Sequence, residues 1–592
     1  MKLNKFLLSA IAAASLTACS DSTDVVDNNK GHWNADGTGY VSLSISMPDN
    51  VGSKGSRTTN DDFHKGDDKE YLVKKALLII FTSTNKDATE DLYTCEAAYD
   101  LTTNFTKEDN GQIGATSKVT QKINQIDANK YAKALVILNA PDDFIANAND
   151  KLSISGSEFT GSFNDFKGKT ATLSTNLADG FTMTNAPLTT AQSTSSTEPS
   201  GSTSTLADID KTKILPTQEQ ASTQPASTIY VERSVAKVTV NNNITTAKPL
   251  PENSKFNIEI KSFALNNTNK ESHIVRNVDN SWNTYVSQAS SVSSYDDKYR
   301  FVGYKEPITF NGENHYRTYW AKDPNYDGNA TLEKNLPTNW EETFGSTHPL
   351  YCLENTFNVA SQTHRNTTRV VVKAEIKDKN NTGDAETLYM WNNDANTLAN
   401  INAFKTTTTG GTSTVGSAVK EANKLYDVIA TGKTIKEIGL STNDGYVTVS
   451  SITFDGEAAI STGAAFDAVK NYFDDIAKYN NGEVYYSVLI KHFGDRLTPW
   501  NAGEWGTEES KKPQSGDVNK IYPSANRNNN YLGRYGVVRN NWYEINLNKI
   551  NKIGTPDIDY DKDTPDDELN SYISVSINIL SWAKRSQDVD LQ

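Results

Sequence analysis

Apolar and polar residues alternate with a period of two along most of the chain, in segments rich in Val, Ile, Tyr and Thr. Such alternation is typical of β-strands that bury one face. Clusters of Asn, Asp, Gly and Ser separate these segments and favour turns. The clearest predicted strands are residues 41–47, 77–81, 134–138, 235–240, 256–265, 369–376, 485–490, 542–547 and 572–582.

Helical periodicity is convincing in two stretches, residues 418–428 and 464–478. In the second stretch, apolar residues recur at the spacing of one helix face; these are Phe466, Val469, Phe473 and Ile476. Both stretches are additions to a β framework, so the pattern predicts an all-β fold with a few short helices.

Two strand pairs with the same plan indicate two tandem β-sandwich domains. Residues 39–47 and 73–81 form the first pair, and residues 229–240 and 256–265 form the second. Between the pairs, residues 188–227 are rich in Ser, Thr, Gln and Pro and are predicted to be a long loop or linker. The predicted division is a signal peptide over 1–18, a segment with the first strand over 19–57, sandwiches over 58–227 and 228–555, and an acidic linker with the last strand over 556–592.

The N-terminus has the pattern of a bacterial lipoprotein signal peptide. Positive charges over residues 1–5 precede an apolar run over 6–15, which is too short to span a bilayer as a permanent helix. Small residues then stand directly before Cys19, as lipoprotein signal peptidase requires. We expect Cys19 to become a lipidated N-terminus, which places the protein in a bacterial envelope. The alternative is an ordinary cleavage site beside an incidental cysteine.

Composition argues against several other classes of protein. A formal net charge of -15 disfavours a broad basic face for nucleic acid or anionic lipid. Cys95 and Cys352 are too few for a disulfide framework and lack zinc-site spacing, so we expect both to be buried. The histidines are scattered, and neither a phosphate-binding loop nor a nucleophile elbow is present. We expect a protein that is not an enzyme and needs no cofactor.

Two features suggest other chemistry. Asp557 to Glu568 has the carboxylate spacing of a calcium loop, but Lys562 stands where that loop needs glycine, so an acidic linker is favoured. Tryptophans such as Trp542 and Trp582 fit core or turn packing better than sugar platforms. Two alternatives stay open: a monomeric surface lipoprotein that binds glycans through exposed aromatics, and a β-sandwich glycoside hydrolase.

Strands near the two termini have matching apolar faces. The residues on the apolar face of the first strand are Val41, Leu43, Ile45 and Met47. Those on the apolar face of the last strand are Ile573, Val575, Ile577 and Ile579. The two strands are therefore suited to the same groove.

A polar, Gly-containing stretch over residues 49–61 follows the first strand and contains Arg57, a target for trypsin-like cleavage. Burial of four apolar side chains contributes about 6 to 12 kcal/mol gross, against a net stability of about 5 to 15 kcal/mol for a typical domain. A domain that lost this strand would need a replacement, and the last strand of another copy would supply one by strand addition. Such contacts are head-to-tail and build a filament. Alternation alone favours the simpler view that both are ordinary strands of one monomer.

Several motifs occur together. They are the cysteine motif at Cys19, residues 44–48 leading to Arg57, residues 231–236, residues 538–541 with 543–547, and residues 573–582 with the terminal 589–591. In this combination the chain resembles the major fimbrial subunit (fimbrillin) family of the Bacteroidales. Residues 270–361 and the Ser/Thr-rich loop match that family poorly.

The resemblance implies transthyretin-like sandwich domains and a lipoprotein precursor at the outer membrane. In this reading an arginine-specific protease cuts between Arg57 and Thr58 and removes the strand Val41 to Met47. The segment Ile573 to Trp582 of another copy then enters the vacated groove. Expected partners are further copies of the chain and fimbrial anchor and tip subunits, in a surface polymer for adhesion and biofilm formation.

Overall fold

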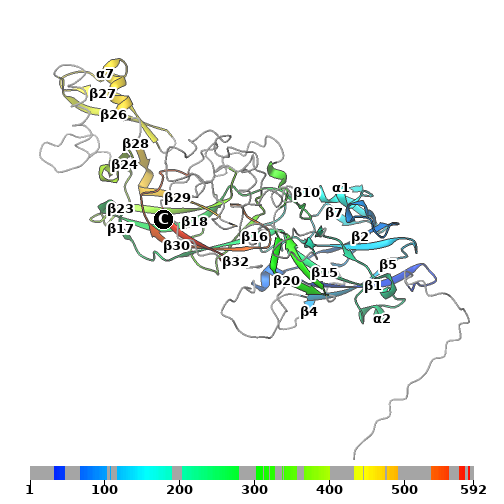
Figure 1. Cartoon of the computed structure of the whole chain (residues 1–592). Coiled ribbons are helices and arrows are strands. Elements are labelled where there is room, and N and C mark those ends of the chain that lie inside the picture. The colour runs from blue at the N-terminus through cyan, green and yellow to red at the C-terminus, as the bar shows by residue number, and fades with distance from the viewer. Residues whose placement is uncertain are drawn as a thin grey trace, which may run out of the picture.

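The computed structural model describes residues 32–46, 67–102, 107–108, 116–189, 203–278, 302–310, 313–318, 321–326, 337, 339–356, 366–400, 433–443, 446–473, 476–490, 492, 535–558, 573–580 and 585–586. These residues form mainly β-sheets with a few short helices (Figure 1), which confirms the predicted all-β fold. Each of the nine strands named from the sequence pattern is present. Within the described residues, no helix is both long and apolar enough to cross a membrane.

The first sheet has nine strands in the order β3-β2-β6-β11-β15-β1-β5-β4, with β14 also paired to β6. Its strands are β1 (Thr38–Ser46), β2 (Ala76–Ser83), β3 (Thr94–Asp100), β4 (Lys107–Glu108), β5 (Thr116–Asn124), β6 (Tyr131–Leu138), β11 (Met183–Asn185), β14 (Ala207–Asp208) and β15 (Ser227–Arg233). In β2, Leu78 and Ile80 belong to one hydrophobic cluster and Ile79 and Phe81 to another. This strand is buried on both faces, which explains its continuous apolar sequence.

Helix α1 (Phe163–Lys167) covers one face of this sheet, where Phe163 and Phe166 pack edge-on against Phe81. Three smaller sheets also occur, in the orders β7-β8-β9, β10-β19 and β13-β12-β21-β20. Their strands are β7 (Phe144–Ala146), β8 (Leu152–Ile154), β9 (Ser157–Glu158), β10 (Thr170–Ala171), β12 (Leu188–Thr189), β13 (Thr203–Ser204), β19 (Ser272–His273), β20 (Val302–Phe310) and β21 (Glu313–Thr318).

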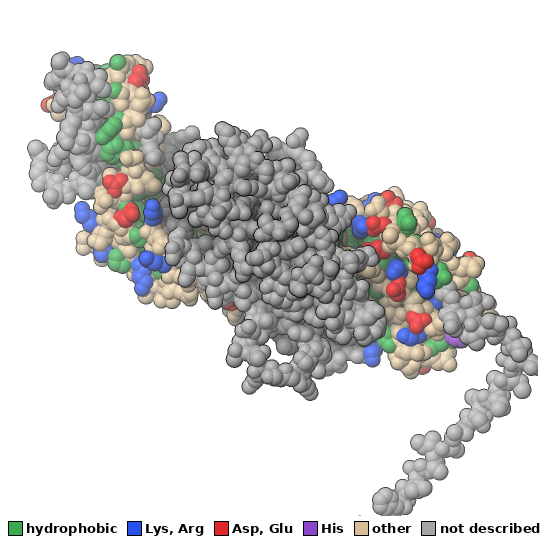
Figure 2. All heavy atoms as spheres, in the orientation of Figure 1, with side chains coloured by type: hydrophobic (Ala, Val, Ile, Leu, Met, Phe, Trp, Pro, Cys, Tyr) green, Lys and Arg blue, Asp and Glu red, His purple; other side chains and the backbone are tan. Residues whose placement is uncertain are grey.

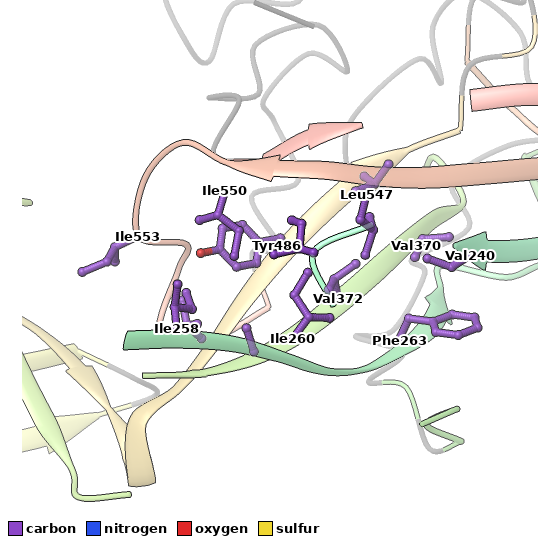
Figure 3. Close-up of a cluster of buried hydrophobic side chains, with 14 of the residues drawn as sticks. Val240, Ile258, Ile260, Phe263, Val370, Val372, Tyr486, Leu547, Ile550 and Ile553 are labelled. Carbon is purple, nitrogen blue, oxygen red and sulfur yellow. The ribbon is translucent and has the colours of Figure 1, made fainter. Parts of the chain in front are cut away.

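Two further sheets enclose a separate hydrophobic core (Figure 3). One consists of β22 (Leu350–Leu353), β16 (Val235–Asn242), β30 (Trp542–Ile550), β31 (Ile573–Leu580) and β32 (Arg585–Ser586), in that order. The other consists of β17 (Lys248–Leu250), β18 (Asn253–Asn266), β23 (Arg369–Asp378) and β29 (Glu483–Leu489). Val240, Ile260 and Leu547 are among the side chains that meet between them.

An additional sheet is inserted between β23 and β29 and projects from one end of the molecule (Figure 1). It contains β24 (Leu388–Trp391), β25 (Ala399–Asn400), β26 (Ile435–Asn443), β27 (Tyr446–Phe454) and β28 (Ile476–Tyr479), with helix α7 (Ala464–Tyr472) against β27. The predicted helix over 464–478 is therefore too long, because its last residues form β28. Phe466 and Ile476 enter the same core from these two elements. The predicted helix over 418–428 lies outside the described residues.

The segment predicted as a linker over 188–227 is partly folded. Residues 203–226 include β14 and helix α2 (Gln218–Ser222), and their apolar side chains Leu206, Ile209, Ile214, Ala221 and Ala226 are buried. These few apolar residues are enough to hold an otherwise polar segment onto the sheet.

The chain passes from the first sheet to the second at Ser234. β15 pairs with β1 and β11, whereas β16 pairs with β22 and β30. The predicted division at residues 227 and 228 thus falls at the start of β15, and the pairing places the crossing a few residues later. On the face shown in Figure 2, acidic and basic side chains of the described residues are interspersed.

Candidate assembly site

The first strand lies inside the sheet and not at its edge. β1 pairs antiparallel with β5 along its whole length, from Thr38 opposite Asn124 to Ser46 opposite Thr116. Its other edge pairs in parallel with β15 from Leu43 to Ser46. Earlier along that edge, Tyr40 and Leu215 exchange both backbone hydrogen bonds, at 2.8 and 3.1 Å. Removal of β1 would therefore leave a slot between two hydrogen-bonding edges.

The apolar face of β1 is part of the core. Val41 and Leu43 are 0% exposed and Ile45 is 2% exposed, all within one cluster with residues of β5, β6 and β15. These three predicted residues thus fill the apolar side of the space that β1 occupies. Met47, the fourth, lies outside the described residues, as do Cys19, Arg57 and Thr58.

The predicted donor strand pairs within its own sheet. β31 lies antiparallel to β30, with Val575 opposite Leu547, Ile577 opposite Ile545 and Ile579 opposite Tyr543. Its other edge pairs with β32 at two positions. Ile573 also belongs to this strand, opposite Ile550, whereas Trp582 lies outside the described residues. The strand is therefore bonded along one edge and largely unpaired, among the described residues, along the other.

The segment after the predicted cleavage site is fixed by a buried carboxylate that sequence reasoning missed. Glu70 is fully buried, and its Oε1 lies 2.7 Å from Lys237 Nζ and accepts a hydrogen bond of 2.7 Å from Tyr351 Oη. The Glu70 carbonyl accepts from Arg233 Nε at 3.1 Å, and the Arg233 guanidinium stacks over the Tyr71 ring. This segment is thus attached to both β15 and β16, and its Glu70 belongs to a capping box with Asp67.

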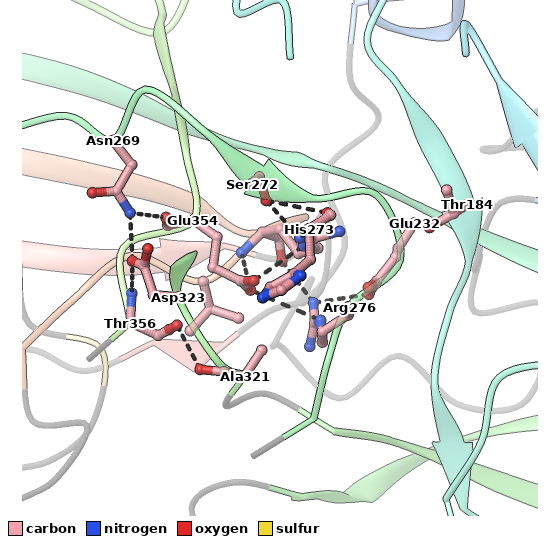
Figure 4. A network of polar contacts seen from close by, with 12 residues as sticks. Thr184, Glu232, Asn269, Ser272, His273, Arg276, Ala321, Asp323, Glu354 and Thr356 are labelled. Atoms are coloured by element: carbon pink, nitrogen blue, oxygen red, sulfur yellow. Dashed lines mark hydrogen bonds and ion pairs between the residues drawn. The ribbon is translucent and has the colours of Figure 1, made fainter. Parts of the chain in front are cut away.

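A second buried network lies where the two parts of the chain meet (Figure 4). Arg276 Nη2 lies 2.8 Å from Glu232 Oε2 on β15 and 3.3 Å from the Arg539 carbonyl. Arg539 Nε in turn lies 3.2 Å from Glu354 Oε1. Buried arginines of this kind are retained because each finds carboxylate and carbonyl acceptors. Asp323 lies beside the network, and burial raises its pKa to about 7 although Asn325 and Asn269 donate hydrogen bonds to it.

Other predicted residues have structural roles. Cys352 is buried and Cys95 is partly buried, and burial raises the pKa of each thiol to about 12. Trp542 is buried, with its indole N–H donating to Thr239 Oγ1 at 2.8 Å and its ring 4.0 Å from Lys237 Nζ, so it is no platform for a sugar. Among the residues that the structure describes, no group of His, Cys, Asp and Glu side chains is arranged to hold a metal ion.

Comparison with known proteins identifies the C-terminal region. Residues 518–588, which include β30 and β31, match the family model for the major fimbrial subunit protein type IV, fimbrillin, C-terminal. Over this segment, the chain is similar to the fimbrillin family.

The chain is also weakly similar to several solved structures. A candidate cell adhesion protein from Parabacteroides distasonis has 9% identity and a TM-score of 0.32, over 92% of this chain and 98% of that one. Another from Bacteroides eggerthii has 10% identity and a TM-score of 0.31, over 94% and 98%. A fimbrial assembly protein from Parabacteroides distasonis has 14% identity and a TM-score of 0.22, over 40% and 65%. Similarity at this level supports no functional conclusion, and no curated protein matches the chain.

Proposed function

We propose that this chain is the stalk subunit of a fimbria and that it assembles by protease-triggered strand exchange. Cleavage between Arg57 and Thr58 removes β1, and residues 573–582 of another copy enter the slot between β5 and β15. The observation that supports this proposal best is the internal, buried position of β1 beside a cleavable stretch. Lipidation of Cys19 holds the precursor at the outer membrane until cleavage releases it.

The sequences of the two strands suggest the register of the exchange. When residues 571–580 are aligned with residues 39–48, Tyr572 falls on Tyr40, Ser574 on Ser42, and Ser576 on Ser44. The same alignment places Ile573, Val575 and Ile577 on the three buried apolar residues of β1. In this alignment the incoming strand runs in the same direction as β1, with apolar residues at the three core positions and serines at the positions of Ser42 and Ser44. A shift by one residue would place serines in the apolar core.

Hydrogen bonding favours the transfer of the last strand. In its own sheet, β31 pairs with β30 on one edge and with the two residues of β32 on the other. In the slot, the same backbone would pair with β5 on one edge and with Leu215 and β15 on the other. In the slot both edges of the strand would pair with described strands, which would offset the loss of the β30 pairing.

The buried Glu70 limits what leaves after cleavage. Its contacts with Lys237 and Tyr351 hold residues 67–71 at the junction of the two sheets. Excision therefore removes β1 without loosening the segment that leads into β2. The resulting polymer supports adhesion and biofilm formation together with anchor and tip subunits, and no enzymatic step or cofactor of this chain is required.

Paired cysteines test the exchange and its register. Ser44 lies opposite the exposed Lys118 on β5, so the proposed alignment places Ser576 of another copy opposite Lys118. After low-dose trypsin treatment and oxidation, Lys118→Cys combined with Ser576→Cys should give disulfide-linked ladders on non-reducing gels. Untreated precursor should give none.

Lys118→Cys combined with Ser574→Cys is the matched control, since a strand slipped by two residues would link that pair instead. Polymers that form without a link at either pair would contradict the proposed slot. A trypsin-treated chain that starts at Thr58 and remains monomeric would contradict the proposed function as a whole.

A further inference from the structure

A short segment crosses over β1, and we call it the strap: residues Ile214–Ala226, which include α2. Both of its ends are hydrogen-bonded to β1. Leu215 forms a two-bond bridge with Tyr40, and the Ala226 amide donates to the Ser42 carbonyl at 2.7 Å. The strap thus leaves the β15 edge of β1 and returns to it two strand positions further on.

The strap lies over the serine face of β1. Helix α2 contacts both β1 and β5 (Figure 1), although β5 pairs with the edge of β1 opposite to the one where the strap is attached. The strap must therefore pass across one face of β1. Val41 and Leu43 fill the other face with the hydrophobic core, which also includes the strap's end residues Ile214 and Ala226. Ala221 of α2 is buried outside that core cluster, so the middle of the strap crosses the face that carries the serines.

Burial along this face is uneven. Ser42 is 0% exposed, and Ala221 on α2 is also 0% exposed, whereas Ser44 and Ser46 are only partly buried. The burial of Ser42 beneath the crossing strap, beside the partly exposed Ser44 and Ser46, indicates that the strap covers the position of Ser42 and leaves the following serine positions accessible. A larger side chain at Ser42 would have to displace the strap, because packed interiors have little room for added methylene groups.

The segment that leads into the strap is attached to the sheet independently of β1. Directly before it, Lys211 is buried, and its Nζ donates to the carbonyls of Asp127, Ala128 and Lys130 at 3.2, 3.0 and 2.6 Å. The Ile209 amide also donates to the Ala132 carbonyl at 3.0 Å. Residues 209–211 therefore stay in place when β1 leaves, and the strap that follows them is available to close over an incoming strand.

We propose that the strap is a size filter for the strand that occupies the slot. It accepts a residue no larger than serine at the position of Ser42 and rejects larger side chains there, whereas the position of Ser44 tolerates them. This inference rests on the proposed strand exchange. The partner is the C-terminal strand of a second copy, in which Ser574 falls on the restricted position and Ser576 on the tolerant one.

Two donor variants form a matched pair. Ser574→Leu should slow the growth of polymer ladders from trypsin-processed protein by about tenfold or more, because the larger side chain must be accommodated as the strand enters and overpacking raises that barrier by an amount worth about this factor. Ser576→Leu should form ladders at the wild-type rate. In the donor's own sheet, the backbone of Ser574 pairs with Lys549, and a urea titration of each unprocessed variant checks that the larger residue leaves the unassembled chain folded. Equal ladder rates for the two variants would overturn the filter.

The filter can also be tested in the precursor, where no assembly is needed. Ser42→Leu should lower the urea midpoint of unfolding and increase cleavage within residues 214–226 by proteinase K, which does not require a basic residue, whereas Ser44→Leu should change neither. If Ser42→Leu and Ser44→Leu behave alike, the filter is wrong even when polymers form. If Ser42→Leu destabilises the precursor and Ser44→Leu does not, but processed wild-type protein never polymerises, the strap restricts residue size at position 42 and the proposed strand exchange is wrong.

Discussion

Leu43→Ala separates the role of β1 in the precursor from its role in the polymer. Leu43 is 0% exposed and lies in the core cluster with Val119 of β5 and Ile229 of β15. Truncation of such a buried leucine removes apolar contact and leaves a cavity, at a cost of about 2 to 5 kcal/mol. This is a large share of the about 5 to 15 kcal/mol that stabilise a typical domain.

The expected result differs between the two states of the protein. The precursor should lose about 2 to 5 kcal/mol of unfolding free energy in urea titrations followed by circular dichroism. Polymers grown from the same variant should dissociate on heating in detergent at the wild-type temperature, since the proposed cleavage has removed residue 43. Ser44→Ala is the control, because it lies on the opposite, partly exposed face of β1 and should change the precursor by less than about 0.5 kcal/mol.

Two outcomes would refute this reasoning. If Leu43→Ala leaves the stability of the precursor unchanged, β1 does not contribute to the core in solution. If the variant lowers the stability of the polymer as much as that of the precursor, β1 remains in the slot after assembly and no other strand has replaced it.

Further predictions concern the junction and the second core. Arg276→Met removes the partner 2.8 Å from buried Glu232 and should cost about 3 to 5 kcal/mol in urea unfolding; no loss would show that the pair is dispensable. Tyr543→Phe removes a buried hydroxyl that accepts from the Val538 amide at 2.9 Å, and the free energy of unfolding in urea should fall by about 1 to 3 kcal/mol. Asp323 has a pKa raised by burial to about 7, so the folded state holds this proton more tightly than the unfolded chain, whose pKa is about 3.9. Its stabilising contribution is complete below about pH 4 and is lost as the pH rises to about 7, by at most about 4 kcal/mol; a pH titration of stability for Asp323→Asn should lack this slope.

Strand periodicity predicted much of the fold. The apolar face of β1 was readable from Val41, Leu43 and Ile45 alone, because a half-buried strand has a period of two and no competing helical pattern. The position of β1 within its sheet was not readable, since pairing with β5 and β15 depends on residues far away in the sequence. Ile476 illustrates a local error: its spacing continues the apolar face of α7, yet it packs into the same core from β28.

The strap and the charged junction were missed for a different reason. Residues 203–226 have the composition of a linker, and only the burial of side chains such as Ile214 reveals that they are folded. Glu70, Arg276 and Arg539 look like surface residues in the sequence, since a charged side chain gives no local sign that a distant partner will bury it. The motif at residues 231–236 was the available signal, because two adjacent opposite charges interrupt an otherwise apolar strand there.

That interruption has a mechanical consequence. Ser234 alone separates β15 from β16, and its two preceding side chains are clamped in different directions, Glu232 to Arg276 and Arg233 to the Glu70 carbonyl. In the proposed filament, the described residues at this crossing would provide no slack between the two parts of a subunit. When it is pulled, both halves of a subunit should be stretched as one stiff unit, and extension should come first from the joints between neighbouring copies.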